Sequence, residues 1–370
     1  MRSKRLVIGT LLTILALAAC SSSALPLGGI VLPDGFHIDV YATDLPDARS
    51  LALGDQGTVF VSTRQRGSIY ALRGDNSQQR ASKKYVIAKD LNTPNGIAFH
   101  KGDLYVATRE QILRFTGIEN RLANPPKAEV IATGFPSDRS HGWRYLGIGP
   151  DDMLYVSIGA PCNICDRQGY ANIVRLKLDG SGREVFAQGV RNSVGFAWQP
   201  QTGEFWFTDN GRDMLGDDSP PDELNHAAKA GMHFGYPYCH GNGIPDPEFG
   251  PGRDCGRYTP PAQALGAHVA ALGMRFYTGD MFPQQYRGDI FIAEHGSWNR
   301  SEKVGYRITR VKLDEQNKAT LYEPFATGWL QGQQAWGRPV DLLVMPDGAL
   351  LVSDDYAGVV YRFSYRKDNR

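Results

Sequence analysis

A short pattern recurs six times along the chain, and it limits the fold more than any other feature of the sequence. In each copy, a turn rich in glycine and aspartate precedes a run of apolar and small residues. A pattern repeated in units of about 40–50 residues indicates one supersecondary unit that is copied within the fold. The copies are GDQGTVFVSTR from Gly54, HKGDLYVATRE from His100, GPDDMLYVSIG from Gly149, PQTGEFWFTDN from Pro200, YRGDIFIAEHG from Tyr286 and MPDGALLVSDD from Met345.

Each copy has a further apolar segment on either side, such as SIYALRG, NIVRLKLDG or VVYRFSY. Short strands joined by hairpin turns are what a propeller blade requires, and no long stretch has helical periodicity. We therefore predict an all-β fold, a six-bladed β-propeller over residues 31–370. The widest gap between copies predicts an insertion around residues 210–277. Two packed β-sandwiches are the alternative, but uniform recurrence favours radial repetition.

Charge balance bears on the kind of partner. The 370 residues include 40 Lys and Arg against 39 Asp and Glu, so the formal net charge is only +1. Nucleic-acid binding depends on a strongly basic surface, which this balance does not provide. We therefore expect no nucleic-acid partner and a small-molecule ligand.

The N-terminus has the pattern of an export signal. Basic residues precede an apolar run that ends in LAAC, and the run is too short for a stable membrane span. We expect residues 1–19 to be the signal peptide. The ending resembles the bacterial lipoprotein box, which predicts lipidation of Cys20 and a tether over residues 20–30. Ordinary secretion with an incidental cysteine is the alternative.

A lipid at this cysteine would anchor the protein to a membrane without spanning it. The expected location is therefore periplasmic and membrane-anchored. Ser21, directly after the lipidated residue, indicates sorting to the outer membrane of a Gram-negative cell.

Export to an oxidising compartment favours disulfides among the four remaining cysteines. The pairs that are local in sequence are Cys162 with Cys165 and Cys239 with Cys255, and we predict these two bonds. The second would close the loop CHGNGIPDPEFGPGRDC, which has little core of its own. For the CNIC pair, a redox centre and half of a zinc site are the alternatives.

Polar residues recur just before the predicted innermost strand of each blade. Because those strands surround the axis, their polar neighbours should gather at one mouth of the channel. Several cations in one ring predict an anionic ligand. Among them, His141 can act as a general base near neutrality, whereas for His268 we expect a structural role. The ring consists of Arg49, Asn95, His141, Arg144, Arg191, Asn192, His268 and Arg338.

At these residues the chain resembles the soluble PQQ-dependent sugar dehydrogenases, in particular the sorbosone and aldose dehydrogenase branch. The resemblance runs from about residue 30 to the C-terminus. It is carried by HGWRYLGIGPDDMLYVSIGAPCNICD, GVRNSVGFAWQPQTGEFWFTDNGRDMLGDDSPPDELN, HFGYPYCHG, AEHGSWNRSEKVGYRITRV and GRPVDLLVMPDGALLVSDD. It implies a six-bladed propeller that binds pyrroloquinoline quinone (PQQ) and calcium at the channel mouth.

The resemblance also implies roles for single residues. His141 matches the base that takes the proton of the substrate hydroxyl. Arg191 and Asn192 match the pair that contacts the quinone oxygens, and Arg338 matches an arginine near the cofactor carboxylates. The implied calcium ligands are the backbone carbonyls of Gly235 and Pro237.

Some positions depart from the family pattern. Ala160 stands where an aspartate often orients the base, with Asp166 or Asp209 as substitutes. In place of a lysine for a cofactor carboxylate the chain offers Trp298 or Arg300. These changes leave the substrate and the next electron acceptor open.

The acidic loop over residues 209–223 has two readings, a second calcium site or a solvated loop. The predicted function is oxidation of a sugar-like alcohol, hemiacetal or hydrated aldehyde by hydride transfer to PQQ. The alternatives are a metal-dependent propeller lactonase and a non-catalytic sugar-binding or assembly lipoprotein, because a fold does not fix a function.

Overall fold

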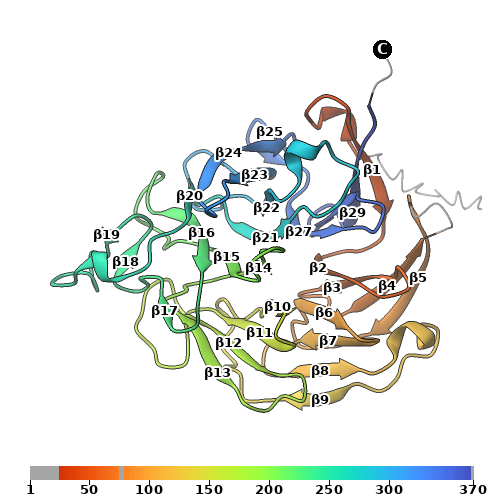
Figure 1. Cartoon of the computed structure of the whole chain (residues 1–370), viewed down its shortest axis with the longest axis horizontal. Helices are drawn as coiled ribbons and strands as arrows, with labels where there is room; N and C mark the ends of the chain where they lie inside the picture. The colour runs from red at the N-terminus through yellow and green to blue at the C-terminus, as the bar shows by residue number, and fades with distance from the viewer. Residues whose placement is uncertain (1–24, 75–78, 368–370) are drawn as a thin grey trace, which may run out of the picture.

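The computed structural model describes residues 25–74 and 79–367, and these include six β-sheets of four or five strands arranged around a central axis (Figure 1). The prediction of an all-β, six-bladed propeller is confirmed, and no α-helix occurs within the described residues. The expected signal peptide and Cys20 lie outside them. Among the described residues, no helix is long and apolar enough to span a membrane.

In the first five blades, the strands run from the axis outward in chain order. Blade 1 contains β2 (Ala48–Leu53), β3 (Val59–Thr63), β4 (Ile69–Gly74) and β5 (Ala81–Ala88), and blade 2 contains β6 (Gly96–His100), β7 (Asp103–Ala107), β8 (Ile112–Phe115) and β9 (Glu129–Ala132). Blade 3 contains β10 (Leu146–Ile148), β11 (Met153–Ile158), β12 (Asn172–Lys177) and β13 (Glu184–Gln188). Blade 4 contains β14 (Gly195–Trp198), β15 (Phe205–Asp209), β16 (Pro221–Ala227) and β20 (Gln263–Ala267), and blade 5 contains β21 (Ala271–Phe276), β22 (Ile290–Glu294), β23 (Arg307–Leu313) and β24 (Ala319–Ala326).

The sixth blade closes the ring with strands from both ends of the chain. It contains β27 (Pro339–Val344), β28 (Leu350–Asp354) and β29 (Val359–Tyr365), and its outermost strand is the N-terminal β1 (Phe36–Ala42). The strands β1 and β29 pair antiparallel, with Phe36 opposite Tyr365. Closure of this kind joins the first and last blades through backbone hydrogen bonds and leaves no gap in the ring.

The second strand of each blade explains the repeated sequence pattern. Four of these strands, such as β3 with VFVST and β28 with LLVSD, are buried along their whole length, and in β7 and β11 only the first residue is partly exposed. Both faces of a blade pack against neighbouring blades, so both sets of alternating side chains must be apolar or small. Separate hydrophobic clusters fill the spaces between blades, and these clusters form the core.

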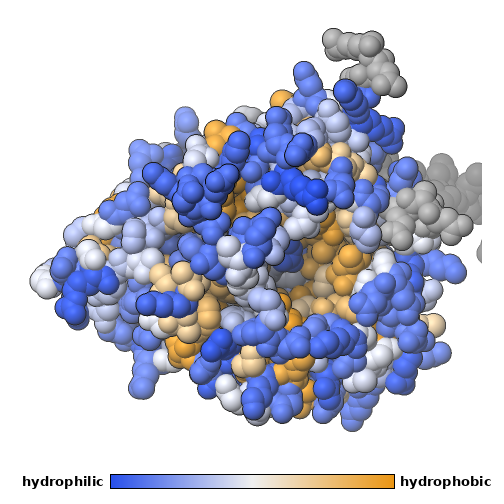
Figure 2. Space-filling model, in the orientation of Figure 1, coloured by the Kyte–Doolittle hydropathy of each residue, from blue (hydrophilic) through white to orange (hydrophobic). Residues whose placement is uncertain are grey.

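The innermost strands approach one another closely at the axis. A Cβ atom on Gly195 would lie 2.1 Å from the carbonyl oxygen of Leu272, and one on Gly273 would lie 2.4 Å from Asp341. Only glycine fits where backbones meet at this distance. Beside these glycines, Val194, Leu272 and Val340 form a small buried apolar cluster with Trp143 packed against it. The face shown in Figure 2 is hollowed near its centre, where the inner strands surround the axis.

The longest connection within a blade lies between β16 and β20 and covers residues 228–262, inside the predicted insertion. It contains β17 (Met232–His233), which pairs parallel with β13 of blade 3, and the small hairpin of β18 (Cys239–His240) with β19 (Ile244–Pro245). The structure forms both of the disulfides, 162–165 and 239–255. The bond between the CNIC sulfurs means that neither sulfur is a free metal ligand.

Candidate active site

A cavity of about 460 Å³ lies at the end of the axis where the innermost strands begin. Residues from five blades line it, including six of the ring residues predicted from the sequence. Four arginines line the cavity, against two aspartates. The lining ring residues are Arg49, His141, Arg191, Asn192, His268 and Arg338, and Trp298 joins them with a 71% exposed side chain.

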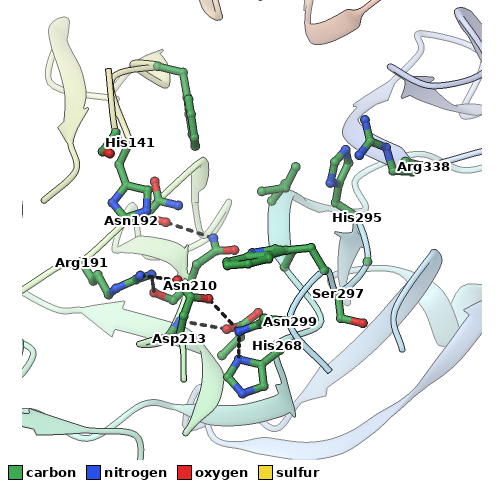
Figure 3. Close-up of a pocket in the computed structure, with 18 of the residues that line it drawn as sticks. His141, Arg191, Asn192, Asn210, Asp213, His268, His295, Ser297, Asn299 and Arg338 are labelled. Atoms are coloured by element: carbon green, nitrogen blue, oxygen red, sulfur yellow. Dashed lines mark hydrogen bonds and ion pairs between the residues drawn. The ribbon is translucent and has the colours of Figure 1, made fainter. Parts of the chain in front are cut away.

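His141 stands on one side of the cavity with a fixed orientation (Figure 3). Its backbone is left-handed, with φ 45°. Its ring Nδ1 lies 2.7 Å from the carbonyl oxygen of Ala160, which can only accept, so Nδ1 carries the proton. Nε2 is therefore the basic nitrogen. Burial, followed by the charge of Arg191, lowers the pKa of His141 to about 3, so the imidazole is neutral at pH 7.

The residue that orients His141 is thus a backbone carbonyl and not a carboxylate. Asp166 instead accepts from the hydroxyl of Tyr238. Asp209 accepts from the backbone N–H groups of Arg191 and Asn192 at 2.8 and 2.6 Å. A side chain at position 160 is not needed, because the loop carries its backbone oxygen to the imidazole.

Arg191 lies beside His141 and is almost fully hydrogen-bonded. Its Nε and Nη2 donate to Asn163, Nη2 also donates to Asp213 at 2.8 Å, and Nη1 donates to the Asn210 carbonyl at 3.2 Å. The side chain of Asn192 lines the cavity and forms no hydrogen bond with another described residue. We call this side, defined by His141, Arg191, Asn192, Asn210 and Asp213, the His141 wall.

The opposite side is organised around one buried carboxylate, Asp355. Its oxygens lie 3.0 Å from Arg49 Nη1, 3.2 Å from Arg338 Nη2 and 3.0 Å from His295 Nε2. Burial opposes ionisation of Asp355, but His295 and Arg49 outweigh it and hold its pKa well below the usual range. We call Arg49, Arg338 and His295 with Asp355 and the adjacent Arg64 the Asp355 wall; Figure 3 shows Arg338 and His295 across from His141.

Some buried donors at the cavity have no partner within the described chain. They are Nε of Arg64, Nε of Arg338 and Nε1 of Trp143. The Arg64 guanidinium lies 5.0 Å from the centre of the Trp143 ring. Burial, followed by the charge of Arg49, lowers the pKa of Arg64 to about 10. Unpaired buried donors are costly, so this donor set fits an anionic, acceptor-rich ligand.

Comparisons with known proteins identify the family of the chain. The TrAA12-like family model matches residues 30–366. The chain belongs to this family. An uncharacterized protein of Borreliella burgdorferi is 34% identical over an alignment of 351 residues, which covers 91% of this chain and 91% of that one.

Solved structures show the same fold at low sequence identity. A calcium structure of a family AA12 carbohydrate-active enzyme from Trichoderma reesei superposes with a TM-score of 0.82 at 20% identity, covering 94% of this chain and 100% of that one. The holo form of the pyranose dehydrogenase PQQ domain from Coprinopsis cinerea has a TM-score of 0.75 at 19% identity, covering 90% and 97%. The PQQ-bound aldose sugar dehydrogenase from Streptomyces coelicolor has a TM-score of 0.66 at 19% identity, covering 91% and 100%.

The structure places some predicted site residues away from the cavity lining. Asn95 is buried, and its Oδ1 accepts a hydrogen bond from Arg49 Nε at 2.9 Å. Arg144 is buried and donates to the carbonyls of Arg109 and Pro136 at 3.1 and 2.6 Å. Arg300 donates to the carbonyl of Asp217, so it fastens the acidic loop. Position next to an inner strand therefore does not by itself direct a side chain to the axis.

The carbonyls expected to hold calcium are also outside the lining. The Gly235 oxygen accepts from the backbone N–H groups of Tyr238 and Cys239 at 2.9 and 3.0 Å, which occupies both of its lone pairs, and Pro237 is buried nearby. These residues do not fit calcium beside the cavity, and we derive no step through it. In residues 25–74 and 79–367, no group of three or more His, Cys, Asp or Glu residues is placed to hold a metal ion, the acidic loop included.

His268 lines the cavity, but both of its nitrogens are engaged. Nε2 lies 2.9 Å from the carbonyl oxygen of Gly216, and Nδ1 lies 3.3 Å from the Asn299 amide nitrogen. A histidine held in this way has no basic nitrogen to offer to a substrate. This arrangement agrees with the structural role expected for His268.

A second set of site residues, which share one position in the repeat, was not predicted from the sequence. Directly after the second strand of their blades stand Arg64, Asn210, His295 and Asp355. The same repeat position in blade 3 is Gly159, where a Cβ atom would lie 2.5 Å from Cβ of His141. The signal was present in the repeat itself, as the last residues of VFVSTR, FWFTDN, IFIAEH and LLVSDD.

Proposed function

We propose that this protein is a PQQ-dependent dehydrogenase that oxidises a sugar-like alcohol, hemiacetal or hydrated aldehyde. The observation that carries the proposal is the contrast across the cavity. A neutral imidazole, whose Nε2 forms no hydrogen bond within the described residues, faces a wall on which two arginines and a histidine share one carboxylate. That pairing suits a proton-transfer step beside an anionic cofactor.

The chain's residues fit this cofactor. PQQ carries carboxylates and, when bound, supplies a hydride acceptor. Arg338 and Arg64, whose Nε donors lack partners, would hold carboxylates on the Asp355 wall. Arg191 and Asn192, on the other wall, would face the part of the ligand next to His141.

The proton path follows from the tautomer of His141. Its Nδ1–H is committed to the Ala160 carbonyl, so Nε2 accepts the proton of the substrate hydroxyl as hydride leaves the same carbon. The product is the carbonyl compound, and the imidazolium is formed beside Arg191. The cost of that charge is lowered when the anionic ligand is bound nearby, because it offsets the arginine field.

Reconstitution tests the proposal. The purified chain is incubated with PQQ, with and without calcium, and reduction of an artificial electron acceptor is followed over a panel of aldoses and ketoaldoses. PQQ-dependent reduction with at least one sugar supports the proposal. If the chain neither binds PQQ nor oxidises any sugar in the panel, the result favours a non-catalytic sugar-binding or assembly module.

We also propose export and lipid attachment at Cys20, supported by the LAAC sequence and the preceding apolar run. Incorporation of radiolabelled palmitate into the wild-type chain, absent from Cys20→Ser, tests this point. Unlabelled wild-type protein recovered from the soluble periplasmic fraction would contradict it.

A further inference from the structure

The loop between β11 and β12, residues 159–171, brings Asn163 directly against Arg191. Arg191 Nε donates to the backbone carbonyl of Asn163 at 2.9 Å, and Nη2 donates to its Oδ1 at 2.8 Å. One residue therefore accepts from two N–H groups on one edge of the guanidinium, and the Arg191 side chain is only 4% exposed. This fork fixes the plane of the guanidinium as well as its position.

Asn163 is also tied to Asp213. Its Nδ2 donates to the Asp213 carbonyl at 3.0 Å, and its Oδ1 accepts from the Asp213 backbone N–H at 2.9 Å. Asp213 in turn accepts from Arg191 Nη2. Three residues from separate segments thus form a closed set of hydrogen bonds, and both polar atoms of the Asn163 side chain are used.

The Cys162–Cys165 disulfide holds the turn that contains this asparagine. The loop forms no strand or helix over residues 159–171, so its own backbone provides little to fix Asn163. Tyr236 supports the turn from the insertion, because its hydroxyl accepts from the Cys165 backbone N–H at 3.0 Å. The disulfide therefore closes the turn whose backbone oxygen accepts from Arg191 Nε.

We propose that Asn163 is a positioning residue for Arg191 and that the Cys162–Cys165 disulfide locks it in place, so that cofactor affinity depends on the redox state of this bond. The inference rests on the proposed function. Reduction by a dithiol converts the disulfide into two cysteine thiols while the reductant becomes a disulfide, which balances electrons and protons. The turn then loses its covalent closure, and the two Asn163 acceptors of Arg191 are no longer held in place.

The first test measures PQQ binding to the full mature chain by equilibrium titration. Asn163→Ala and the pair Cys162→Ser with Cys165→Ser are each expected to bind roughly 10- to 100-fold more weakly than wild type, because hydrogen bonds to a charged group are lost. The matched control is Cys239→Ser with Cys255→Ser, which opens the other disulfide, neither half of which lines the cavity. Its affinity should stay within about threefold of wild type, since it breaks no contact to the lining.

The second test observes Arg191 without any ligand. In protein with ¹⁵N-labelled arginine, the Nε–H signal of Arg191, assigned by its loss in Arg191→Lys, should exchange slowly with solvent in wild type. It should exchange at least about tenfold faster in Asn163→Ala and in dithiothreitol-reduced wild type, because the protecting acceptor moves.

The outcomes separate the two proposals. If wild type binds PQQ and both Asn163→Ala and the Cys162→Ser, Cys165→Ser variant bind it with the same affinity, this inference is overturned and the proposed function stays intact. If wild type does not bind PQQ, the proposed function fails, and the exchange rate of the Arg191 Nε–H signal then decides whether Asn163 positions Arg191. Exchange that is unchanged by the variants and by reduction then contradicts the positioning role.

Discussion

The two walls of the cavity hold positive charge in opposite ways. On the His141 wall, one guanidinium is satisfied by a carboxylate, an amide oxygen and backbone carbonyls. On the Asp355 wall, two guanidiniums and an imidazole share one carboxylate, and two arginine Nε donors remain unpaired. The first arrangement steadies a neutral base, whereas the second leaves an excess of donors for an anion. Proton transfer and anion binding are thus assigned to different walls.

Removal of the base is the strongest test of the assignment of proton transfer and anion binding to different walls. His141→Gln is expected to lower kcat by roughly 10²–10⁴-fold, the usual contribution of a general base, while PQQ affinity changes little. Steady-state dye reduction and a PQQ titration measure the two quantities. The control is His268→Gln, which should cost much less in kcat because both nitrogens of His268 are already engaged. Equal losses in the two variants would refute the assignment.

The second prediction compares the carboxylates of the two walls. Asp355→Asn leaves two buried guanidiniums and an imidazole without their shared anion and should lower the free energy of unfolding by about 3–5 kcal/mol. Asp213→Asn should cost about 1–3 kcal/mol, because Arg191 keeps its other acceptors. Urea unfolding of both variants measures the difference. If Asp213→Asn is the more destabilising, the two walls are not built as described.

The third prediction compares a lining arginine with a buried one. Arg338→Met should weaken PQQ binding by roughly 10- to 100-fold, because it removes a charged donor with an unpaired Nε. Arg144→Met should lower stability but leave the affinity of the folded protein nearly unchanged, because Arg144 bonds only to carbonyls away from the cavity. Thermal unfolding and titration separate these effects, and weak binding in Arg144→Met would contradict them.

The smallest expected effect is a pH dependence of stability. The pKa of His141 is lowered to about 3 in the fold, whereas an unfolded histidine titrates near 6.5. Below pH 6.5 the unfolded chain therefore binds the extra proton, and stability falls as pH falls toward 3. Between pH 7.5 and 5.5, wild type should lose about 1 kcal/mol more than His141→Gln. Parallel losses in the two proteins would show that His141 is not held neutral.

Much of the fold could be predicted because each second strand repeats a buried apolar run after a turn. The contribution of β1 to the last blade could not, since its partner β29 lies at the other end of the chain. Ring closure depends on a pairing across the whole sequence, and local patterns do not record it.

Prediction of the site succeeded where a side chain faces the axis. It failed where hydrogen bonds hold the side chain away from the cavity. Arg49 and Arg144 stand in similar sequence contexts, but only Arg49 reaches the cavity, because Arg144 is bound by carbonyls of blade 2 and the loop that follows it. The orienting role of the Ala160 carbonyl could not be foreseen, because a backbone oxygen has no sequence signature. Asp355 could have been found, because it is the last residue of its repeat copy and other copies also have a polar residue at this position.

The most direct measurement is a titration of the purified chain with PQQ at physiological ionic strength. The account predicts saturable binding at one site per chain, abolished or greatly weakened in the double variant Arg49→Met with Arg338→Met. Absence of saturable binding to wild type, or equal affinity in a folded double variant, would contradict the claim that the Asp355 wall is an anion site.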